Sequence, residues 1–231
     1  MLDTSTPNIA RAYDYLLGGG ANFAADRALA GRLQGLYPRT AALLLSSRTY
    51  LADSVAAVAA AGVDQYLDVG SGLPTRPNTH ETARAARPLA RVVYVDRDPA
   101  VVAHGNTLVP SGVRFVPGDL AEPEALLGTL PGLIDLSRPA CLVLTMVLQV
   151  LDPGTARAVV GVLVRALAPG SYLVLSAGAG ESGRLPDAVA PDGCTAEDLT
   201  SLFGGLDLVP PGVRLAGEVL CGTGVKAARR G

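Results

Sequence analysis

The sequence has no tryptophan, one lysine, two histidines and three cysteines in 231 residues. Cys141, Cys194 and Cys221 lie too far apart for a disulfide framework or a zinc site, so we expect no bound metal. A net charge of −2 leaves no basic surface for a nucleic-acid partner. Apolar runs stay below the roughly 20 residues that a membrane span needs, and the N-terminus lacks the features of a signal peptide. We therefore expect a cytoplasmic protein without nucleic-acid or membrane partners.

Apolar residues, in contrast, are plentiful. Hydrophobic types make up 49% of the chain, and charged types only 17%. A chain of this length and composition can bury one large core. The same apolar composition is compatible with a homodimer.

Hydrophobic periodicity divides the chain at about residue 63. Before this point, apolar residues recur at helical spacing in residues 7–17, 22–36 and 40–61. From residue 64, short apolar segments alternate with helical ones, which is typical of a parallel, doubly wound sheet. Strands are expected at residues 65–69, 91–95, 113–116, 140–147, 172–176, 206–209 and 218–225, with a loop at 178–193. We predict an N-terminal helical cap over residues 1–63 and one compact α/β domain over residues 64–231.

A glycine turn follows the first expected strand. Asp68 lies near the end of that strand, Gly70 and Gly72 follow, and a helix begins soon afterwards. Such a turn exposes backbone N–H groups beside a ligand, which indicates a nucleoside cofactor. The fingerprint for NAD requires a third glycine where this chain has Thr75, and Asp68 would repel a pyrophosphate. A P-loop is excluded because no G-K-[ST] follows. S-adenosylmethionine, which carries a sulfonium and an ammonium group, fits the negative charge better.

Two further carboxylates come at the ends of the next expected strands. Asp96 ends the second strand, where a carboxylate can accept hydrogen bonds from both hydroxyls of a ribose. Asp98, directly before Pro99, is placed to cap the following helix, which leaves Asp96 for another role. Asp119 follows the third strand and can contact an adenine amine or, equally, cap a turn.

Three blocks of sequence resemble an actinobacterial family of S-adenosylmethionine-dependent methyltransferases long labelled a domain of unknown function. They are P-N-I-A-R-A-Y-D-Y-L-L-G-G-G-A-N-F-A-A-D, L-D-V-G-S-G-L-P-T-R-P-N-T-H-E and V-V-Y-V-D-R-D-P-A-V-V-A-H, at residues 7–26, 67–81 and 92–104. The resemblance implies a class I methyltransferase fold, Rossmann-like, with a seven-stranded, mostly parallel sheet in the order 3-2-1-4-5-7-6. It also implies that Asp68, Gly70, Gly72, Asp96 and Asp119 line the cofactor site, and that Arg11, Tyr13, Gly19 and Asn22 lie over the cofactor or the substrate. We assign Ser71, Arg97, Leu120 and Thr145 to the same S-adenosylmethionine site. From spacing alone, the first block reads instead as a helix whose Tyr13 packs and whose glycines form a C-cap.

The candidate catalytic residues are His80, Tyr13 and Gln149. His80 could accept a proton or could only cap and support a helix, whereas Tyr13 and Gln149, together with Asp152, could orient a substrate. Gln149 stands where the family usually has histidine, and glutamine cannot take a proton near neutral pH. One hypothesis is therefore a methyltransferase that acts on a small molecule of secondary metabolism. The other is a methyltransferase-like protein that has lost methyl transfer and serves as a cyclase, an isomerase or a cofactor-binding partner.

Overall fold

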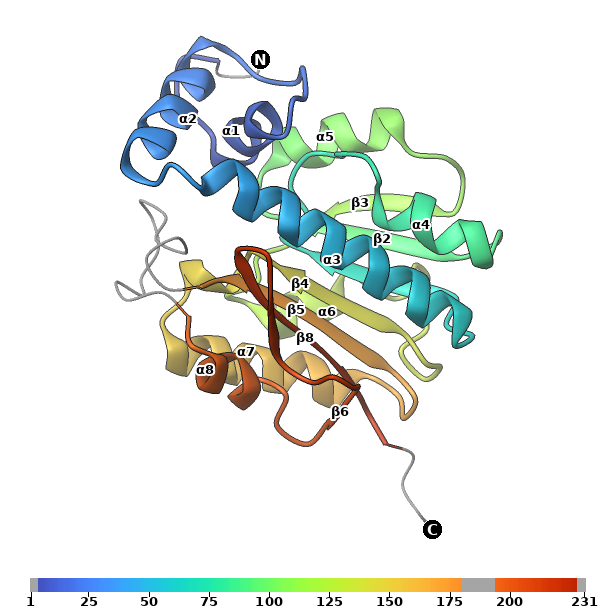
Figure 1. Ribbon diagram of the computed structural model, residues 1–231. Coiled ribbons are helices and arrows are strands. Elements are labelled where there is room, and N and C mark those ends of the chain that lie inside the picture. Colours follow the sequence, from blue (N-terminus) through green and yellow to red (C-terminus); the bar gives the residue numbers. More distant parts are fainter. Residues whose placement is uncertain (1–3, 180–193, 228–231) are drawn as a thin grey trace.

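The computed structural model describes residues 4–179 and 194–227 (Figure 1). Three helices come first, namely α1 (Ile9–Leu16), α2 (Ala24–Leu36) and α3 (Thr40–Ala60). Strands and helices then alternate: β1 (Gln65–Val69), α4 (Thr79–Ala86), β2 (Arg91–Asp96), α5 (Pro99–Leu108), β3 (Val113–Pro117), α6 (Pro123–Gly128), β4 (Cys141–Thr145), the 3-10 turn η1 (Leu148–Val150), α7 (Pro153–Ala166) and β5 (Tyr172–Gly178). The chain closes with α8 (Ala196–Ser201), β6 (Asp207–Leu208), β7 (Arg214–Ala216) and β8 (Val219–Val225).

The sheet runs in the order β3-β2-β1-β4-β5-β8-β6. β1 to β5 are parallel, and β8 enters antiparallel between β5 and β6. This order confirms the predicted class I methyltransferase topology, with β8 in the place of the seventh strand. The sequence did not predict β7, a three-residue strand that pairs with β8. Most of the loop expected at residues 178–193 lies outside the described residues.

Each face of the sheet has its own core, because successive side chains of a strand point to opposite faces. On one face, Leu67 and Val69 of β1 pack in a cluster with residues of α6 and α7. On the other face, Tyr66 packs in a cluster with residues of α3 and α4. Figure 1 shows the same arrangement, with the long helix α3 lying across one face of the sheet and α7 and α8 on the opposite face. The carboxyl ends of β1 to β4 therefore form an edge between two helical layers.

Helix α3 is attached to the sheet, whereas α1 and α2 pack together at the carboxyl edge (Figure 1). Ser47 of α3 lies 2.9 Å from Ser176 of β5, hydroxyl to hydroxyl, and the Tyr50 hydroxyl lies 2.8 Å from that of Thr223. The division into a helical cap and a sheet domain at residue 63, like the homodimer, stays a prediction. Within the described residues, no helix is both long and apolar enough to cross a membrane.

The fourth strand ends two residues earlier than expected. β4 stops at Thr145 because Met146 adopts a φ of 53°, in the left-handed region that side chains other than glycine rarely occupy. The chain then forms η1 in place of further strand. This bend carries Gln149 over the carboxyl edge of the sheet.

Candidate active site

A cavity of about 480 Å³ lies at the carboxyl edge, between α1 and the loops that follow β1, β2, β3 and β4. This volume falls in the range of roughly 300–1,000 Å³ that is common for small-molecule sites. Many of the predicted site residues line it, namely Tyr13, Gly70, Ser71, Gly72, Asp96, Arg97, Asp119, Leu120, Thr145 and Gln149. Arg11, Gly19, Asn22, Asp68 and His80 do not line it, and their contacts are described below.

The glycine turn is fixed to the neighbouring strand by its own backbone. The N–H groups of Gly70 and Ser71 donate to the carbonyl oxygen of Val95, at 2.8 and 3.2 Å. Gly70 and Gly72 have φ values of 69° and 63°, a conformation that glycine adopts without steric cost. The turn therefore presents main chain, without side chains at either glycine, to the cavity.

Asp96 joins this turn to the loop after β2. Its Oδ2 accepts a hydrogen bond from the Gly72 N–H at 2.9 Å, and its Oδ1 accepts one from the Asp98 N–H at 2.9 Å. Burial raises the pKa of Asp96 above its ordinary value, and these two backbone donors oppose that shift. Each carboxylate oxygen keeps a second lone pair, so Asp96 can still accept hydrogen bonds from a ligand in the cavity. Asp98 caps α5 as predicted, through the Ala100 N–H.

The loop between α1 and α2 wraps around the buried carboxylate of Asp14. Asp14 Oδ2 accepts hydrogen bonds from the Ala21 N–H at 2.8 Å and from the Asn22 amide at 3.0 Å. A Cβ at Gly19 would lie only 2.0 Å from Asp14 Oδ1. Gly19 and Asn22 thus shape the loop around Asp14, and Asp14 itself lines the cavity next to Tyr13.

Replacing Gly19 with alanine should lower the free energy of unfolding by about 2–4 kcal/mol, because Asp14 must move away from its two donors. The matched control is Gly20→Ala, whose Cβ would meet no atom within 4 Å. Urea denaturation of both variants measures the difference. Equal free energies of unfolding for the two variants would show that Asp14 can move away from its donors without loss of stability.

Arg11 holds the two N-terminal helices together. Its Nε donates to Asp26 Oδ2 at 2.8 Å, and both side chains are buried. Asp26 also accepts hydrogen bonds from the N–H groups of Asn8 and Phe23, and although burial opposes it, these contacts lower the pKa of Asp26. The Asn8 side chain in turn donates to Asp98, on the loop that carries Asp96. Arg11 therefore positions α1, with Tyr13, over the cavity.

Asp68 lies beneath the cavity floor, because strand alternation points it to the face covered by α3 and α4. The Thr79 hydroxyl donates to Asp68 Oδ2 at 2.6 Å, and the carboxylate is 4% exposed. Burial raises the pKa of Asp68 to about 6, with the charge of Asp96 adding to the shift while Thr79 and Arg48 oppose it. Asp68 can therefore stabilise a bound cation only through its electrostatic field and not by direct contact.

The raised pKa predicts how Asp68 affects stability with pH. The folded protein binds this proton more tightly than the unfolded chain, so stability from this group is full below about pH 4 and is lost as the pH rises through 6. Asp68→Asn, which keeps an acceptor for Thr79, should therefore be more stable than wild type at pH 7.5, by up to about 3 kcal/mol, and not at pH 4.

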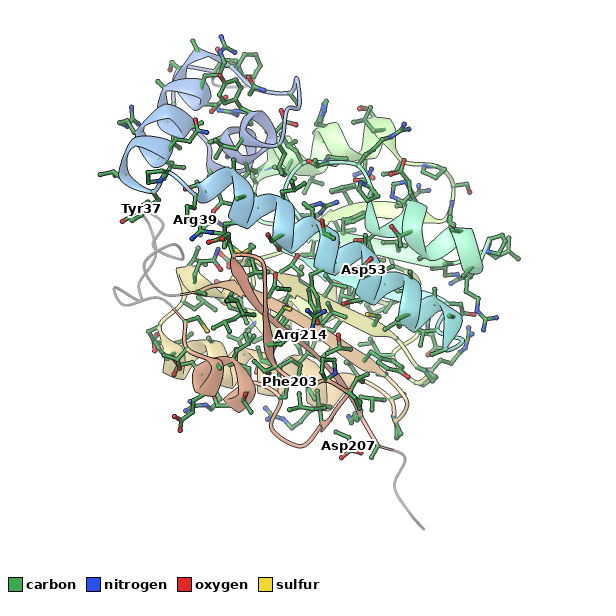
Figure 2. All side chains as sticks on the ribbon, viewed as in Figure 1. Tyr37, Arg39, Asp53, Phe203, Asp207 and Arg214 are labelled. Atoms are coloured by element: carbon green, nitrogen blue, oxygen red, sulfur yellow. The ribbon has the colours of Figure 1, made fainter. Side chains whose placement is uncertain are left out.

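Denaturant unfolding at both pH values measures this difference. The control is Asp53→Asn, which removes a carboxylate that is exposed on α3 (Figure 2). A variant of Asp68 that loses stability equally at both pH values would contradict the prediction.

His80 is buried at the start of α4, away from the cavity. Its backbone N–H donates to the Tyr94 hydroxyl, and its Nδ1 lies 2.9 Å from the same oxygen. Burial lowers the pKa of His80, which favours the neutral ring. These contacts correspond to the supporting role considered for His80, since nothing brings its ring to the cavity lining.

Two other candidate carboxylates cap turns. Asp119 accepts a hydrogen bond from the Ala121 N–H at 2.9 Å and also lines the cavity. It can therefore cap the turn and contact an adenine amine, the two roles considered for it. Asp152 is the N-cap of α7, accepting from the N–H groups of Gly154 and Thr155. It is exposed and does not line the cavity.

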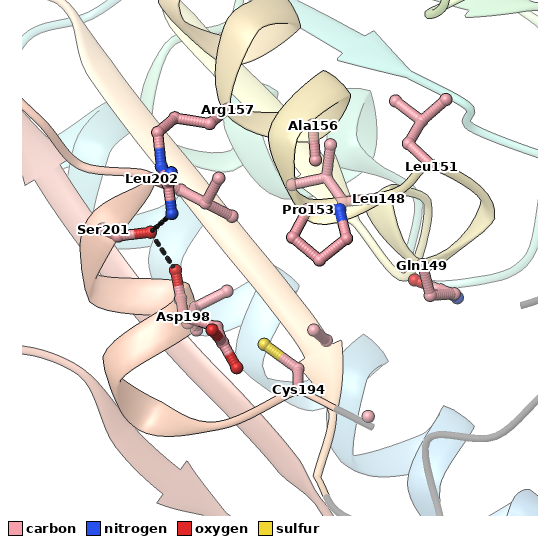
Figure 3. Close-up of a pocket in the computed structure, with 13 residues that line it drawn as sticks. Leu148, Gln149, Leu151, Pro153, Ala156, Arg157, Cys194, Asp198, Ser201 and Leu202 are labelled. Atoms are coloured by element: carbon pink, nitrogen blue, oxygen red, sulfur yellow. Dashed lines mark hydrogen bonds between the residues drawn. The ribbon is translucent and has the colours of Figure 1, made fainter. Parts of the chain in front are cut away.

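Gln149 lines both the main cavity and a second, smaller pocket of about 80 Å³, whose lining residues are drawn in Figure 3. Its Nε2 donates to the Met146 carbonyl oxygen at 2.6 Å, whereas its Oε1 is buried without a hydrogen-bond partner. The smaller pocket lies between η1, α7, β5 and α8, and its lining is mainly apolar: Leu148, Leu151, Pro153, Ala156, Ala177, Leu199 and Leu202. Gln149 and Leu151 belong to the walls of both spaces.

The sequence-based prediction missed Arg48 of α3, which also lines the main cavity. Its terminal nitrogen donates to the carbonyl oxygens of Thr75 and Pro77, at 2.5 Å each. A signal for it exists in the sequence. Arg48 falls on the same helical stripe as the buried Leu44, Leu51 and Val55, and a charge on the buried face of a helix indicates a specific role.

Comparison with known proteins identifies the family. A model of a family described as S-adenosyl methyltransferase matches residues 1–219. The chain belongs to this family. It is an S-adenosylmethionine-dependent methyltransferase, and its cofactor is S-adenosylmethionine. No protein with a curated description matches the chain.

Solved structures agree with this assignment. The chain is 38% identical to a provisionally assigned methyltransferase from Thermobifida fusca YX, with a TM-score of 0.87 over 98% of this chain and 97% of that one. It is 28% identical to a DUF574 family protein from Streptomyces avermitilis MA-4680, with a TM-score of 0.86 over 97% and 99%. The N-methyltransferase NodS from Bradyrhizobium japonicum WM9, in complex with S-adenosyl-L-homocysteine, shares the fold at 17% identity and a TM-score of 0.54, over 77% and 86%.

The charges that line the cavity fit this cofactor. Asp14, Asp96, Asp98 and Asp119 make the lining acidic, which favours a cationic sulfonium and ammonium and disfavours a pyrophosphate. Arg48 supplies a cation beyond the glycine turn, and its Nε is buried without a hydrogen-bond partner. The open backbone at Gly72, where a Cβ would meet only Ala10 at 3.8 Å, leaves room for a ligand against the main chain.

Proposed function

We propose that the protein methylates a small molecule whose acceptor atom lies beside Gln149. The observation that carries this proposal is the junction at Gln149, where the cofactor-sized cavity meets the apolar pocket of Figure 3. A pocket of about 80 Å³ suits a small aliphatic group or the edge of a ring. The role in secondary metabolism rests on the family resemblance and stays a prediction.

The residues of the chain would hold and orient the two reactants. Asp96 would accept hydrogen bonds from the ribose hydroxyls, and Asp119 would contact the adenine amine. When bound, the cofactor supplies an electrophilic methyl group on its sulfonium. Tyr13 and Gln149 would align the acceptor, and the unpartnered Oε1 of Gln149 would accept a hydrogen bond from its N–H or O–H group.

The acceptor chemistry follows from the groups that are missing beside Gln149. Among the described residues that line the cavity, there is no histidine, lysine or glutamate, and glutamine cannot accept a proton near neutral pH. The four aspartates of the lining already accept backbone hydrogen bonds, from the N–H groups of Ala21, Gly72, Ala100 and Ala121. We therefore expect the acceptor to present a lone pair without help from a base. Amines of low pKa, thiolates and carboxylates satisfy this condition, whereas alcohols and most phenols do not.

Methyl transfer from labelled S-adenosylmethionine to matched amines, thiols, carboxylates, phenols and alcohols tests the proposal. Transfer is expected only to the first three classes. Gln149→His, which introduces a base, should extend transfer to phenols, whereas Gln149→Leu should reduce transfer without changing the affinity for S-adenosylhomocysteine. Cofactor binding with no transfer to any class would contradict the proposed activity, and wild-type transfer to alcohols at neutral pH would contradict the role of Gln149.

A further inference from the structure

The cavity must bind one anionic group of the cofactor, although most of the charged residues that line it are acidic. S-adenosylmethionine ends in an α-carboxylate, but four aspartates line the cavity. Among the described lining residues, only Arg48 and Arg97 are basic. Arg97 is exposed and follows Asp96, at the end of the cavity where the ribose is expected. Arg48 lies on α3, beside the loop that continues from the glycine turn.

Arg48 is held in place before any ligand arrives. Its neighbour Ser47 is buried and its hydroxyl contacts that of Ser176 on β5, which fixes this turn of α3 against the sheet. One terminal nitrogen of Arg48 donates to the carbonyl oxygens of Thr75 and Pro77. These contacts fix the plane of the guanidinium, so little conformational entropy is lost when it binds a further group.

The remaining donors of Arg48 are not all used inside the protein. Its Nε is buried and has no hydrogen-bond partner, which is costly for a charged group unless a ligand satisfies it. No salt bridge joins Arg48 to an acidic side chain in the part of the chain that the structure describes. The nearby carboxylate of Asp68 is already bonded to Thr79, beneath the floor.

We propose that Arg48 binds the α-carboxylate of the methionine moiety of the cofactor. The Nε–H of Arg48 has no partner among the described residues and can donate to a carboxylate oxygen in a charge-assisted hydrogen bond. Asp96 and Arg48 then hold opposite ends of the same ligand, with the glycine turn between them. This inference rests on the proposed function, because it uses the same cavity for the same cofactor.

Binding measurements with two matched ligand pairs test this assignment without any activity assay. S-adenosylhomocysteine has the amino-acid moiety, which 5′-methylthioadenosine lacks. S-adenosylmethionine has the carboxylate, which decarboxylated S-adenosylmethionine lacks. By calorimetry, wild type should bind the first member of each pair more tightly, by about 10–100-fold for the carboxylate pair. Arg48→Gln should abolish most of this preference while leaving the affinity for 5′-methylthioadenosine within about threefold.

Two further variants distinguish the role of Arg48 from support of the loop. Arg48→Lys should retain part of the preference, because the charge remains while the Nε–H donor is lost. Arg97→Gln, at the other basic residue of the lining, should leave the preference unchanged. Equal affinity of wild type for S-adenosylmethionine and its decarboxylated form would overturn the proposal. An equal loss of affinity for all four ligands in Arg48→Gln would overturn it as well. If wild type bound none of the adenosyl ligands, the assignment of this cavity to the cofactor would itself be overturned.

Discussion

Gly70→Ala is expected to destabilise the protein by about 2–5 kcal/mol and to weaken cofactor binding by at least about 100-fold. Two costs add at this position. The φ of 69° is unfavourable for alanine, and a Cβ would lie 2.1 Å from Val147 Cγ2 and 2.9 Å from Val147 Cβ. The second distance places the obstacle close to the backbone of the loop after β4, where rotation of a side chain cannot remove it.

The effect on binding follows from what the turn carries. If the chain shifts at Gly70 to relieve the clash, the Gly72 N–H moves relative to Asp96, which it contacts at 2.9 Å. Val147 also lines the cavity, so displacement on either side of the contact alters the ligand site. Both unfolding and binding should therefore respond to this one methyl group.

Two variants separate these costs. Gly18→Ala has a φ of 82° but meets no atom within 4 Å, so it should lose only the backbone contribution of about 1–2 kcal/mol. Val147→Ala combined with Gly70→Ala removes the nearest atom and should recover part of the loss. Urea denaturation and calorimetry with S-adenosylhomocysteine measure both effects. If Gly70→Ala lowered the free energy of unfolding no more than Gly18→Ala does, Val147 would have to move away from the new methyl group without a measurable cost.

The elements of the sheet were predictable because buried parallel strands appear in the sequence as short apolar runs. β1 was predicted at its observed bounds, and β2, β3 and β5 within one or two residues. β7 carries no such signal, since it has three residues and two of them are exposed. The end of β4 was also hidden, because the positive φ of Met146 arises from its surroundings and not from its residue type.

The sequence predicted where the site lies, at the carboxyl ends of the strands, but not which residue near each strand end faces the cavity. Asp96 and Gly72 line the cavity as this reasoning expects, but Asp68, one residue from the end of β1, points to the face where α4 supplies Thr79. A resemblance to a family could not distinguish residues that contact a ligand from those that support the contact. Gly19 is such a support, since it is required by Asp14 and not by the cavity.

Asp96→Ala is expected to weaken the binding of S-adenosylhomocysteine by about 100–1,000-fold without a comparable loss of stability. Two hydrogen bonds from ribose hydroxyls to a charged acceptor account for about 3–4 kcal/mol. Burial raises the pKa of Asp96, so the free protein holds this carboxylate ionised at a cost. Removing it releases that cost at neutral pH, which offsets the loss of the contacts from the Gly72 and Asp98 N–H groups.

This separation of binding from folding is the measurable signature of a ligand-binding carboxylate. Asp96→Asn should have an intermediate effect of about 10-fold, because its amide carbonyl can still accept but its NH₂ group cannot. The loss in Asp96→Ala should be the same for S-adenosylhomocysteine and 5′-methylthioadenosine, since both contain the ribose. Asp119→Ala, at the neighbouring strand end, should cost only about 3–10-fold through one neutral amine contact. Unchanged affinity of Asp96→Ala for 5′-methylthioadenosine would remove Asp96 from the ribose site, whereas equal losses of stability and affinity would make it a structural residue of the turn.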